Sequence, residues 1–175
     1  SVLLFLLPLR FANADKVHGI AMHGTLKYNS NFTHLDYVNP NAPNGGSVKF
    51  GSYGSFDNLN RVAFKGSKAA GLGYVNDTLM RRVWDEAFTL YALIAEYIEI
   101  PDDRSSITFF INPDAKFHDG SSITREDVLF SLKTFQEKGT PNQKKTYGKV
   151  IETEEVGTNG LKMIFVNVRN GKQVC

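Results

Sequence analysis

The sequence predicts a mixed α/β fold, and three observations carry this prediction. Residues 107–111 alternate between two unlike faces, with the period of two residues that a strand requires. Thr124 precedes apolar residues at helical spacing, which predicts a capped amphipathic helix. Farther along, two apolar runs are joined by Asn159-Gly160, a strong signal for a β-hairpin. Strands and a helix are therefore expected together in one chain.

The strand around residues 107–111 is expected to extend over 105–112. Pro113 ends it, because proline has no backbone N–H for the ladder and fixes one backbone dihedral. A short extended run over 115–117 then leads to a turn at His118-Asp119-Gly120, where the aspartate is expected to accept hydrogen bonds from nearby backbone amides.

The helix is expected to begin after Thr124. Asp127, three residues later, resembles the partner of a capping box, although Glu or Gln is usual there, and Glu126 adds a second acid at the positive end of the helix dipole. Gly139 and Pro141 are expected to end the helix. Its apolar face is expected to consist of Val128, Leu129, Leu132 and Phe135.

Weaker signals predict the remaining elements. Alternation and apolar runs predict strands, while apolar residues four apart predict helices. The strands are expected over 47–50, 97–100, 151–156 and 161–166, the helix over 75–83, and a short helical turn over 91–95. The strand over 47–50 leads into a loop of small residues over 51–60, and loops at the carboxyl ends of strands commonly receive ligands.

Length and composition indicate one ordinary globular domain. A chain of 175 residues can build a real core but is too short for two large lobes. Hydrophobic residues make up 42% and charged residues 22%, which excludes a disordered or fibrous protein. The formal net charge is only +2, and basic residues are interspersed with acids, which argues against a nucleic-acid partner.

The two ends of the chain are expected to lie outside the fold. Residues 1–14 resemble the end of a secretory signal peptide, truncated at its start, because an apolar run precedes Ala12-Asn13-Ala14. Residues 15–46 lack a sustained period and are expected to form an extended arm with turns. Cys175, the single cysteine, has no partner for a disulfide or a cysteine-based metal site.

No catalytic or metal-binding motif is present in the sequence. The four histidines have no helical i, i+4 spacing, so they are expected to be surface or hydrogen-bonded residues. His118-Asp119 could suggest acid/base chemistry, but Gly120 makes a turn the better interpretation. There is no nucleophile elbow and no His-Glu-x-x-His helix. We therefore expect no enzyme, no cofactor and no bound metal.

Several separated segments resemble one family. The order of an aromatic residue, His118-Asp119-Gly120, a small-residue spacer, Thr124 and Asp127-Val128 is similar to the defining segment of the family 5 extracytoplasmic solute-binding proteins. More specifically, the chain resembles the oligopeptide-binding branch called YejA-type. The segments that carry this second resemblance are His18-Gly19, Phe32–Tyr37, Val38–Pro43, Gly45-Gly46, Ser55–Asn60, Phe64–Gly66 and Asp77–Met80.

The resemblance implies a periplasmic-binding-protein type II-like fold, of which residues 47–168 would form part of lobe one with a small mixed α/β accessory subdomain. It implies the substrate-binding component of an ABC importer, which captures oligopeptides or related solutes in the periplasm and delivers them to an inner-membrane permease. Such a protein is expected to be a monomer. Two departures are Asn60-Arg61, where the branch usually has Asn-Pro, and residues 169–175, which look like an unrelated tail. The second lobe is also missing.

The loop after residue 50 is the expected ligand wall. Aromatic faces would pack on solute side chains while small polar groups bind peptide amides. The alternative is that Phe56 belongs to the core and Asp57 shapes a turn. Two other functional classes remain open, a non-binding remnant of a split receptor gene and an extracytoplasmic hydrolase. The expected ligand-binding residues are Tyr53, Ser55, Phe56, Asp57 and Asn58.

Overall fold

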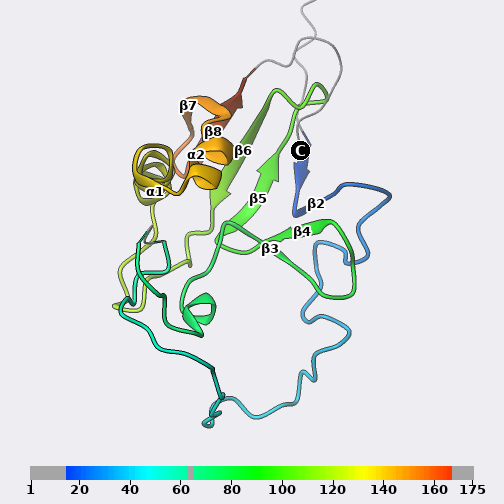
Figure 1. Cartoon of the computed structure of the whole chain (residues 1–175). Helices are drawn as coiled ribbons and strands as arrows, with labels where there is room; N and C mark the ends of the chain where they lie inside the picture. Colours follow the sequence, from blue (N-terminus) through cyan, green and yellow to red (C-terminus); the bar gives the residue numbers. More distant parts are fainter. Residues whose placement is uncertain (1–14, 63–64, 167–175) are drawn as a thin grey trace, which may run out of the picture.

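Two antiparallel sheets and two α-helices make up most of the regular structure in the described residues (Figure 1). The computed structural model describes residues 15–62 and 65–166. The expected signal peptide over 1–14, the tail over 169–175, Phe64 and Cys175 lie outside the described residues. The mixed α/β class is confirmed, and it agrees with the expected part of a type II-like fold.

The larger sheet has five strands in the order β1-β5-β6-β8-β7, and the smaller has three in the order β2-β4-β3. All strand pairs in both sheets are antiparallel. The strands of the larger sheet are β1 (Lys16–Val17), β5 (Ala95–Glu99), β6 (Ser106–Ile111), β8 (Gly160–Phe165) and β7 (Val150–Val156). Those of the smaller sheet are β2 (Gly19–Ala21), β4 (Thr89–Ala92) and β3 (Met80–Arg82).

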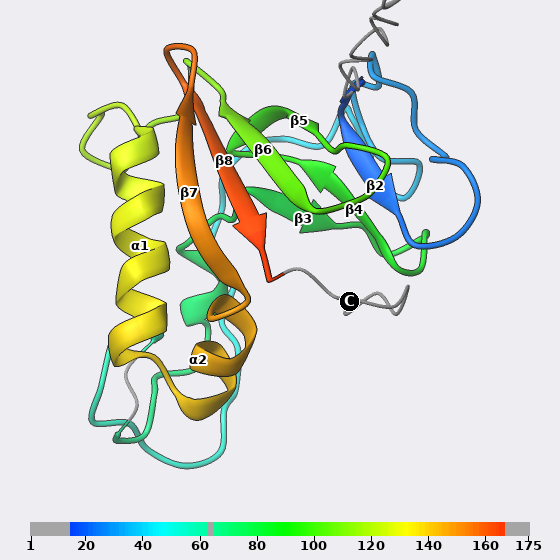
Figure 2. The same cartoon turned by 90° about the horizontal axis from the view of Figure 1, so that it is seen from above.

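One helix covers one face of the larger sheet. Figure 2 shows α1 (Arg125–Lys138) lying alongside β7 and β8. Leu132 of α1 is buried against Leu161 and Met163 of β8, and burial of such side chains is the main favourable term in folding. The half-buried side chains around this cluster come from the expected face of α1, from one face of β6, from β7 and from the residue before β3, namely Val128, Leu129, Ile107, Phe109, Val150 and Leu79.

The predicted capping box of α1 is confirmed. The Thr124 hydroxyl accepts a hydrogen bond from the Asp127 backbone N–H at 3.3 Å, and the Asp127 carboxylate accepts from the Thr124 N–H at 2.9 Å. The two residues thus satisfy two donors at the helix start that have no partner inside the helix. Gly139 forms the expected end of the helix.

A second helix, α2 (Pro141–Tyr147), was not predicted. Thr140 and Gln143 form another capping box, with Pro141 in the first turn, where its missing N–H costs nothing. Pro141 therefore separates two helices instead of only ending one. The ring of Phe135 stacks on that of Tyr147 with 4.8 Å between their centroids, which holds α2 against α1.

The strands expected over 97–100, 105–112, 151–156 and 161–166 are confirmed with small shifts in their bounds. The Asn159-Gly160 signal correctly placed the β7–β8 hairpin, whose strands pair from Val150↔Phe165 to Val156↔Gly160. The short run over 115–117 is reduced to an isolated bridge between Lys116 and Ser122.

Both helices predicted between 75 and 95 are wrong. Apolar residues four apart fit a helix, but Met80–Arg82 pairs with β4 as strand β3. The Leu79 carbonyl accepts hydrogen bonds from the Leu93 and Ala95 amides at 3.0 and 3.1 Å. Residues 89–92 alternate between buried and half-buried side chains as β4. Pairing between distant segments has overridden the local pattern here.

The strand predicted over 47–50 is also wrong. Val48 and Phe50 are 74% and 79% exposed, and no strand pairs with this run among residues 15–62 and 65–166. The arm expected over 15–46 begins with β1 and β2, which join the two sheets, and continues without helix or strand from residue 22. Neither helix in the described ranges is long and apolar enough to cross a membrane.

Candidate functional site

The five expected ligand residues lie in the loop over 51–60, which has no helix or regular strand (cyan in Figure 1). The side chain of Tyr53 is fully exposed and that of Phe56 is 58% exposed. Phe56 is therefore not a core residue of the described structure. Ser55 and Asp57 are exposed, and Asn58 is half-buried.

Asp57 and Asn58 bind a second loop over 65–69, and we call this pairing of loops the clasp. The Asp57 carboxylate accepts a hydrogen bond from the Ser67 backbone N–H at 2.7 Å. The Asp57 and Asn58 amides both donate to the Ser67 carbonyl, at 3.0 and 3.2 Å. The Asn58 carbonyl accepts from the Ala69 amide at 2.9 Å. These bonds supply partners for backbone groups that no sheet or helix satisfies.

Side-chain bonds of Asn58 complete the clasp. Its amide nitrogen donates to the Lys65 carbonyl at 3.3 Å, and its side-chain oxygen accepts from the Asn60 N–H at 2.7 Å. The second bond is an Asx turn, which shapes the loop locally. The structure thus uses Asp57 and Asn58 to shape the loop, while Tyr53 and Phe56 point their rings to solvent.

Gly66 permits the close approach of the two loops. Its φ is +89°, and a Cβ at this position would lie 2.5 Å from the Asp57 carboxylate oxygen. Any other L-residue would be strained in this conformation and would collide with Asp57. Sequence reasoning did not identify Gly66 and Ser67 as partners of the loop, because a ten-residue separation carries no periodic signal.

An aromatic contact links the start of the loop to a short 3-10 turn, η1 (Leu72–Tyr74). The rings of Phe50 and Tyr74 are nearly parallel, with an interplanar angle of 8° and 6.4 Å between centroids. Both side chains remain largely exposed. Phe50 and Tyr74 therefore present their rings to solvent on either side of the clasp.

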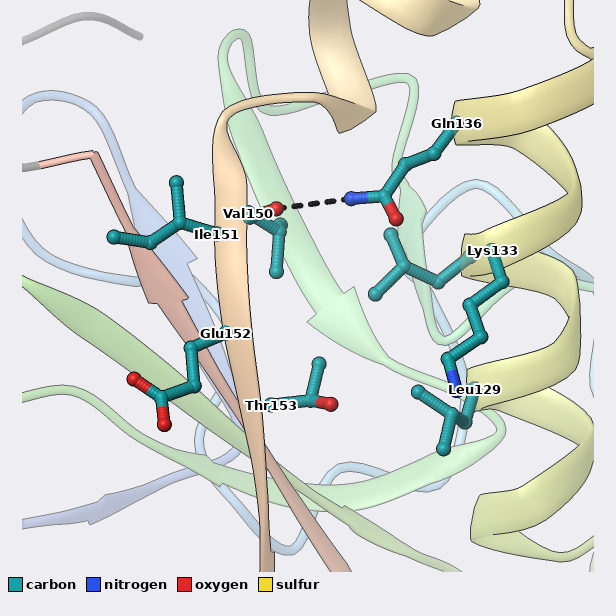
Figure 3. Close-up of a pocket in the computed structure, with 8 residues that line it drawn as sticks. Leu129, Lys133, Gln136, Val150, Ile151, Glu152 and Thr153 are labelled. Carbon is teal, nitrogen blue, oxygen red and sulfur yellow. Dashed lines mark hydrogen bonds between the residues drawn. The ribbon is translucent and has the colours of Figure 1, made fainter.

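A separate hollow of about 320 Å³ lies between α1 and β7. Figure 3 shows Leu129, Lys133 and Gln136 of α1 facing Val150 and Thr153 of β7, while Ile151 and Glu152 point away. Gln136 closes one end, because its amide donates to the Val150 and Tyr147 carbonyls, at 2.9 Å each. The buried Leu132 also lines this hollow, which adjoins the core rather than the predicted ligand loop.

A second hollow of about 270 Å³ lies next to the turn at 118–120. Its polar lining includes Asp77, Asp114, Lys116 and His118, and its apolar lining includes Ile94. The Asp119 carboxylate accepts hydrogen bonds from the Ser121 hydroxyl and backbone N–H, at 2.6 and 2.9 Å, as predicted for a turn. These bonds lower the pKa of Asp119 below its ordinary value.

His18 and His34 make hydrogen bonds and His23 is exposed, which agrees with the expectation for the arm. His18 Nε2 lies 2.8 Å from the Tyr28 carbonyl, and His34 Nδ1 lies 3.1 Å from the Thr33 hydroxyl. Within residues 15–62 and 65–166, no group of three His, Cys, Asp or Glu side chains is placed to hold a metal ion.

A polar cluster that sequence reasoning missed attaches the arm to the loop between β3 and β4. Lys27 Nζ lies 2.8 Å from the Asp36 carboxylate and 2.6 Å from that of Asp85. The Tyr28 hydroxyl donates to Asp85 and accepts from the Asp36 N–H, and the Tyr28 N–H donates to the Tyr91 hydroxyl at 3.1 Å. The contacts with Asp85 and Tyr91 join residues about sixty positions apart, so no local pattern could indicate them.

The cluster shifts the acidity of its members. Hydrogen bonds to Asp36 and then Asp85 raise the pKa of Lys27 above its ordinary value. The bonds from Lys27 and then Tyr28 lower the pKa of Asp85, because both stabilise the ionised carboxylate. Burial, followed by the hydrogen bond to Asp85, raises the pKa of Tyr28. The contacts therefore favour a charged Lys27, a charged Asp85 and a neutral Tyr28.

Comparison with known proteins identifies a family. Residues 89–168 match the model of the bacterial extracellular solute-binding proteins, family 5. The chain is 39% identical over 173 residues to the peptidoglycan-binding protein YepA of Agrobacterium fabrum. This alignment covers 94% of this chain and 28% of the YepA protein. The chain is also 38% identical over 152 residues to the probable peptide-binding protein YejA of the same organism. That alignment covers 87% of this chain and 25% of the YejA protein.

Two solved structures of binding proteins match about half of the chain. One is AgaA from A. tumefaciens R10, solved with agropinic acid. The match covers 50% of this chain and 17% of the AgaA chain, with 26% sequence identity and a TM-score of 0.44. The other is MoaA from the same strain, solved with mannopinic acid. The match covers 54% of this chain and 20% of the MoaA chain, with 25% sequence identity and a TM-score of 0.46.

The similarity in sequence runs through nearly the whole chain, whereas the chain spans only about a quarter of the length of the curated relatives it matches. Those relatives carry the names of binding proteins rather than enzymes. The match to the family model includes the capped helix α1 and the β7–β8 hairpin, which are also the elements best predicted from the sequence. The chain belongs to the bacterial extracellular solute-binding proteins of family 5.

Proposed function

We propose that this chain is part of the substrate-binding component of an ABC importer. It captures oligopeptides or related solutes in the periplasm and delivers them to an inner-membrane permease. Membership of family 5 supports the general binding role, and the names of the two Agrobacterium relatives support peptides or peptide-bearing glycan fragments as solutes. Residues 1–14 would serve as the signal peptide, 15–46 as an arm and 47–168 as part of lobe one, with 169–175 as a separate tail.

The observation that carries the proposal is the exposure of Tyr53 and Phe56 directly before the clasp, whose hydrogen bonds begin at Asp57. Contiguous exposed apolar groups can mark a site of interaction, and Tyr53 and Phe56 are exposed three residues apart on one loop. An aromatic ring supplies apolar contact area at a small cost in conformational entropy. A loop already held in shape also loses less entropy when a solute binds.

Calorimetric titration tests the proposal with two probes, the tripeptide Ala-Phe-Ala and muramyl dipeptide. Because the chain spans a quarter of its relatives, the titration uses this chain and also a chimaera, in which the chain replaces the matched region of the Agrobacterium YepA relative. We expect the chimaera to bind at least one probe, and the Tyr53→Ala/Phe56→Ala double variant to bind it more weakly.

Trp84→Ala is the matched control, because Trp84 is an equally exposed aromatic residue outside this loop. The Trp84→Ala chimaera should bind the probe with the same affinity as the parent chimaera. Two results would contradict the proposal. One is a chimaera that binds neither probe while the intact relative binds one of them. The other is an affinity that the double variant leaves unchanged, which would show that the loop is not the ligand wall.

A further inference from the structure

We propose that Asp57 is a positioning residue, which shapes the loop over 53–58 but does not contact the solute. Tyr53 and Phe56 then contact it, and the site selects neutral or anionic solutes that present a ring or an apolar side chain. This inference rests on the proposed function and narrows the class of solute.

The Asp57 carboxylate already has a partner within the protein. One carboxylate oxygen accepts from the Ser67 N–H at 2.7 Å, and the Asp57 amide donates to the Ser67 carbonyl at 3.0 Å. Two bonds between the same two residues fix the distance and orientation of the loops. A solute donor that replaced the Ser67 N–H at this oxygen would break the bond that shapes the loop.

Gly66 shows that the carboxylate is packed as well as hydrogen-bonded. The position of an added Cβ on Gly66 lies 2.5 Å from the Asp57 oxygen and 3.3 Å from the carboxyl carbon. The loop over 65–69 therefore covers that side of the Asp57 side chain. Asn58 adds to the attachment through its bond to the Lys65 carbonyl.

Charge argues for the class of solute. The segment over 51–69 contains one acid, Asp57, and three basic residues, Arg61, Lys65 and Lys68. The three basic residues outnumber the charged Asp57, so the segment has a positive excess that repels a solute ammonium group. Tyr53 and Phe56 supply apolar faces, which suit a ring or an apolar side chain.

Three variants of the chimaera separate positioning from contact. In Asp57→Asn the side-chain oxygen can still accept from Ser67 while the charge is lost, so its affinity should stay within about twofold of the parent. Asp57→Ala removes the acceptor and should weaken binding about tenfold. Gly66→Ala should weaken binding to a similar extent, although it adds only a methyl group. Equal losses in Asp57→Asn and Asp57→Ala would overturn the proposal, because they would show a charge contact with the solute.

Two probes of opposite charge test the class of solute. Acetyl-Ala-Phe-Ala has a free carboxylate and no amine, whereas Ala-Phe-Ala-amide has an amine and no carboxylate. We expect the acetylated peptide to bind at least about fivefold more tightly at low salt, and the difference to shrink as salt is added. Tighter binding of the amide would overturn the assignment of the solute class.

Amide hydrogen exchange in this chain tests the clasp without any ligand. Asp57→Ala should speed exchange of the Ser67 amide at least about threefold, and Asp57→Asn should leave its rate near that of the parent. Unchanged exchange in Asp57→Ala would overturn the positioning role. If no probe binds the chimaera, the proposed function fails, while the exchange rates still decide whether Asp57 holds the loop.

Discussion

Asn159 and Ile111 exchange two hydrogen bonds at the end of the larger sheet. The Asn159 side-chain nitrogen donates to the Ile111 carbonyl at 2.7 Å, and the Ile111 amide donates to the Asn159 carbonyl at 3.0 Å. Ile111 is the last residue of β6, and Asn159 lies in the turn between β7 and β8. Asn159 thus attaches the turn of the β7–β8 hairpin to the end of β6, the strand that pairs with β8.

Replacing Asn159 with alanine should therefore destabilise the chain. The substitution leaves the carbonyl of the buried Ile111 without its side-chain donor, at a cost of about 1–2 kcal/mol. Asn159 does not have a positive φ, so alanine introduces no backbone strain. Urea unfolding monitored by circular dichroism measures the difference. The neighbouring Thr158→Ala, at an exposed position, should change stability by less than about 0.5 kcal/mol.

Thr124→Ala should weaken the start of α1. The Thr124 hydroxyl accepts from the Asp127 N–H, and loss of such a cap costs about 1 kcal/mol. The same urea titration measures the loss in the free energy of unfolding. Ser131→Ala, at an exposed position in the middle of α1, is the control and should leave the protein equally or slightly more stable. Equal effects of the two substitutions would contradict a capping role for Thr124.

Leu132→Ala should cause the largest loss of stability among these changes. Leu132 is 5% exposed and packs against Leu161 and Met163, so truncation removes buried apolar surface and leaves a cavity. We expect a loss of about 2–3 kcal/mol in the free energy of unfolding, because the adjoining hollow already leaves one side loosely packed. Phe130→Ala provides the comparison, since Phe130 is 72% exposed on the same helix and should change stability little. A similar loss in both variants would show that α1 does not pack as described.

Asp85→Asn should change the dependence of stability on pH. The pKa of Asp85 in the folded chain lies below its ordinary value of 3.8, because Lys27 and Tyr28 stabilise the carboxylate. The charged form therefore adds stability at all pH values above about 4, and this contribution disappears as pH falls through the lower pKa of the folded state.

The difference in free energy of unfolding between the parent and Asp85→Asn should be the same at pH 7 and pH 5 and should shrink at pH 3. Urea titrations at the three pH values measure it. Asp102→Asn, an exposed aspartate in the turn after β5, should show no such dependence. A difference that grows toward acid pH would contradict the ion pair with Lys27.

Local signals were sufficient where an element is stabilised by residues close in sequence. The Thr124–Asp127 cap, the apolar face of α1 and the Asn159-Gly160 turn all involve residues within a few positions of one another, and all were predicted correctly. The second capping box, at Thr140 and Gln143, has the same local character and was visible in the sequence, although Pro141 was interpreted only as a helix end.

Long-range pairing decided the elements that were predicted wrongly. Val75, Leu79 and Val83 are spaced as on a helix, yet Met80–Arg82 takes strand geometry because β4 supplies its hydrogen-bonding partner. Val48 and Phe50 alternate as in a strand, but no described strand pairs with them. A period of apolar residues does not identify the segment that will lie alongside, so such a pattern fits more than one structure.

The amino-acid sequence by itself determined the α/β class, the capped helix α1, the hairpin and the family to which the chain belongs. Only the tertiary structure decided that Asp57 binds Ser67 and that Lys27 joins Asp36 to Asp85. The physical reason lies in the range of the interactions. Caps and turns are completed by neighbours along the chain, whereas the clasp and the polar cluster exist only after folding brings distant backbone and charged groups within hydrogen-bonding distance.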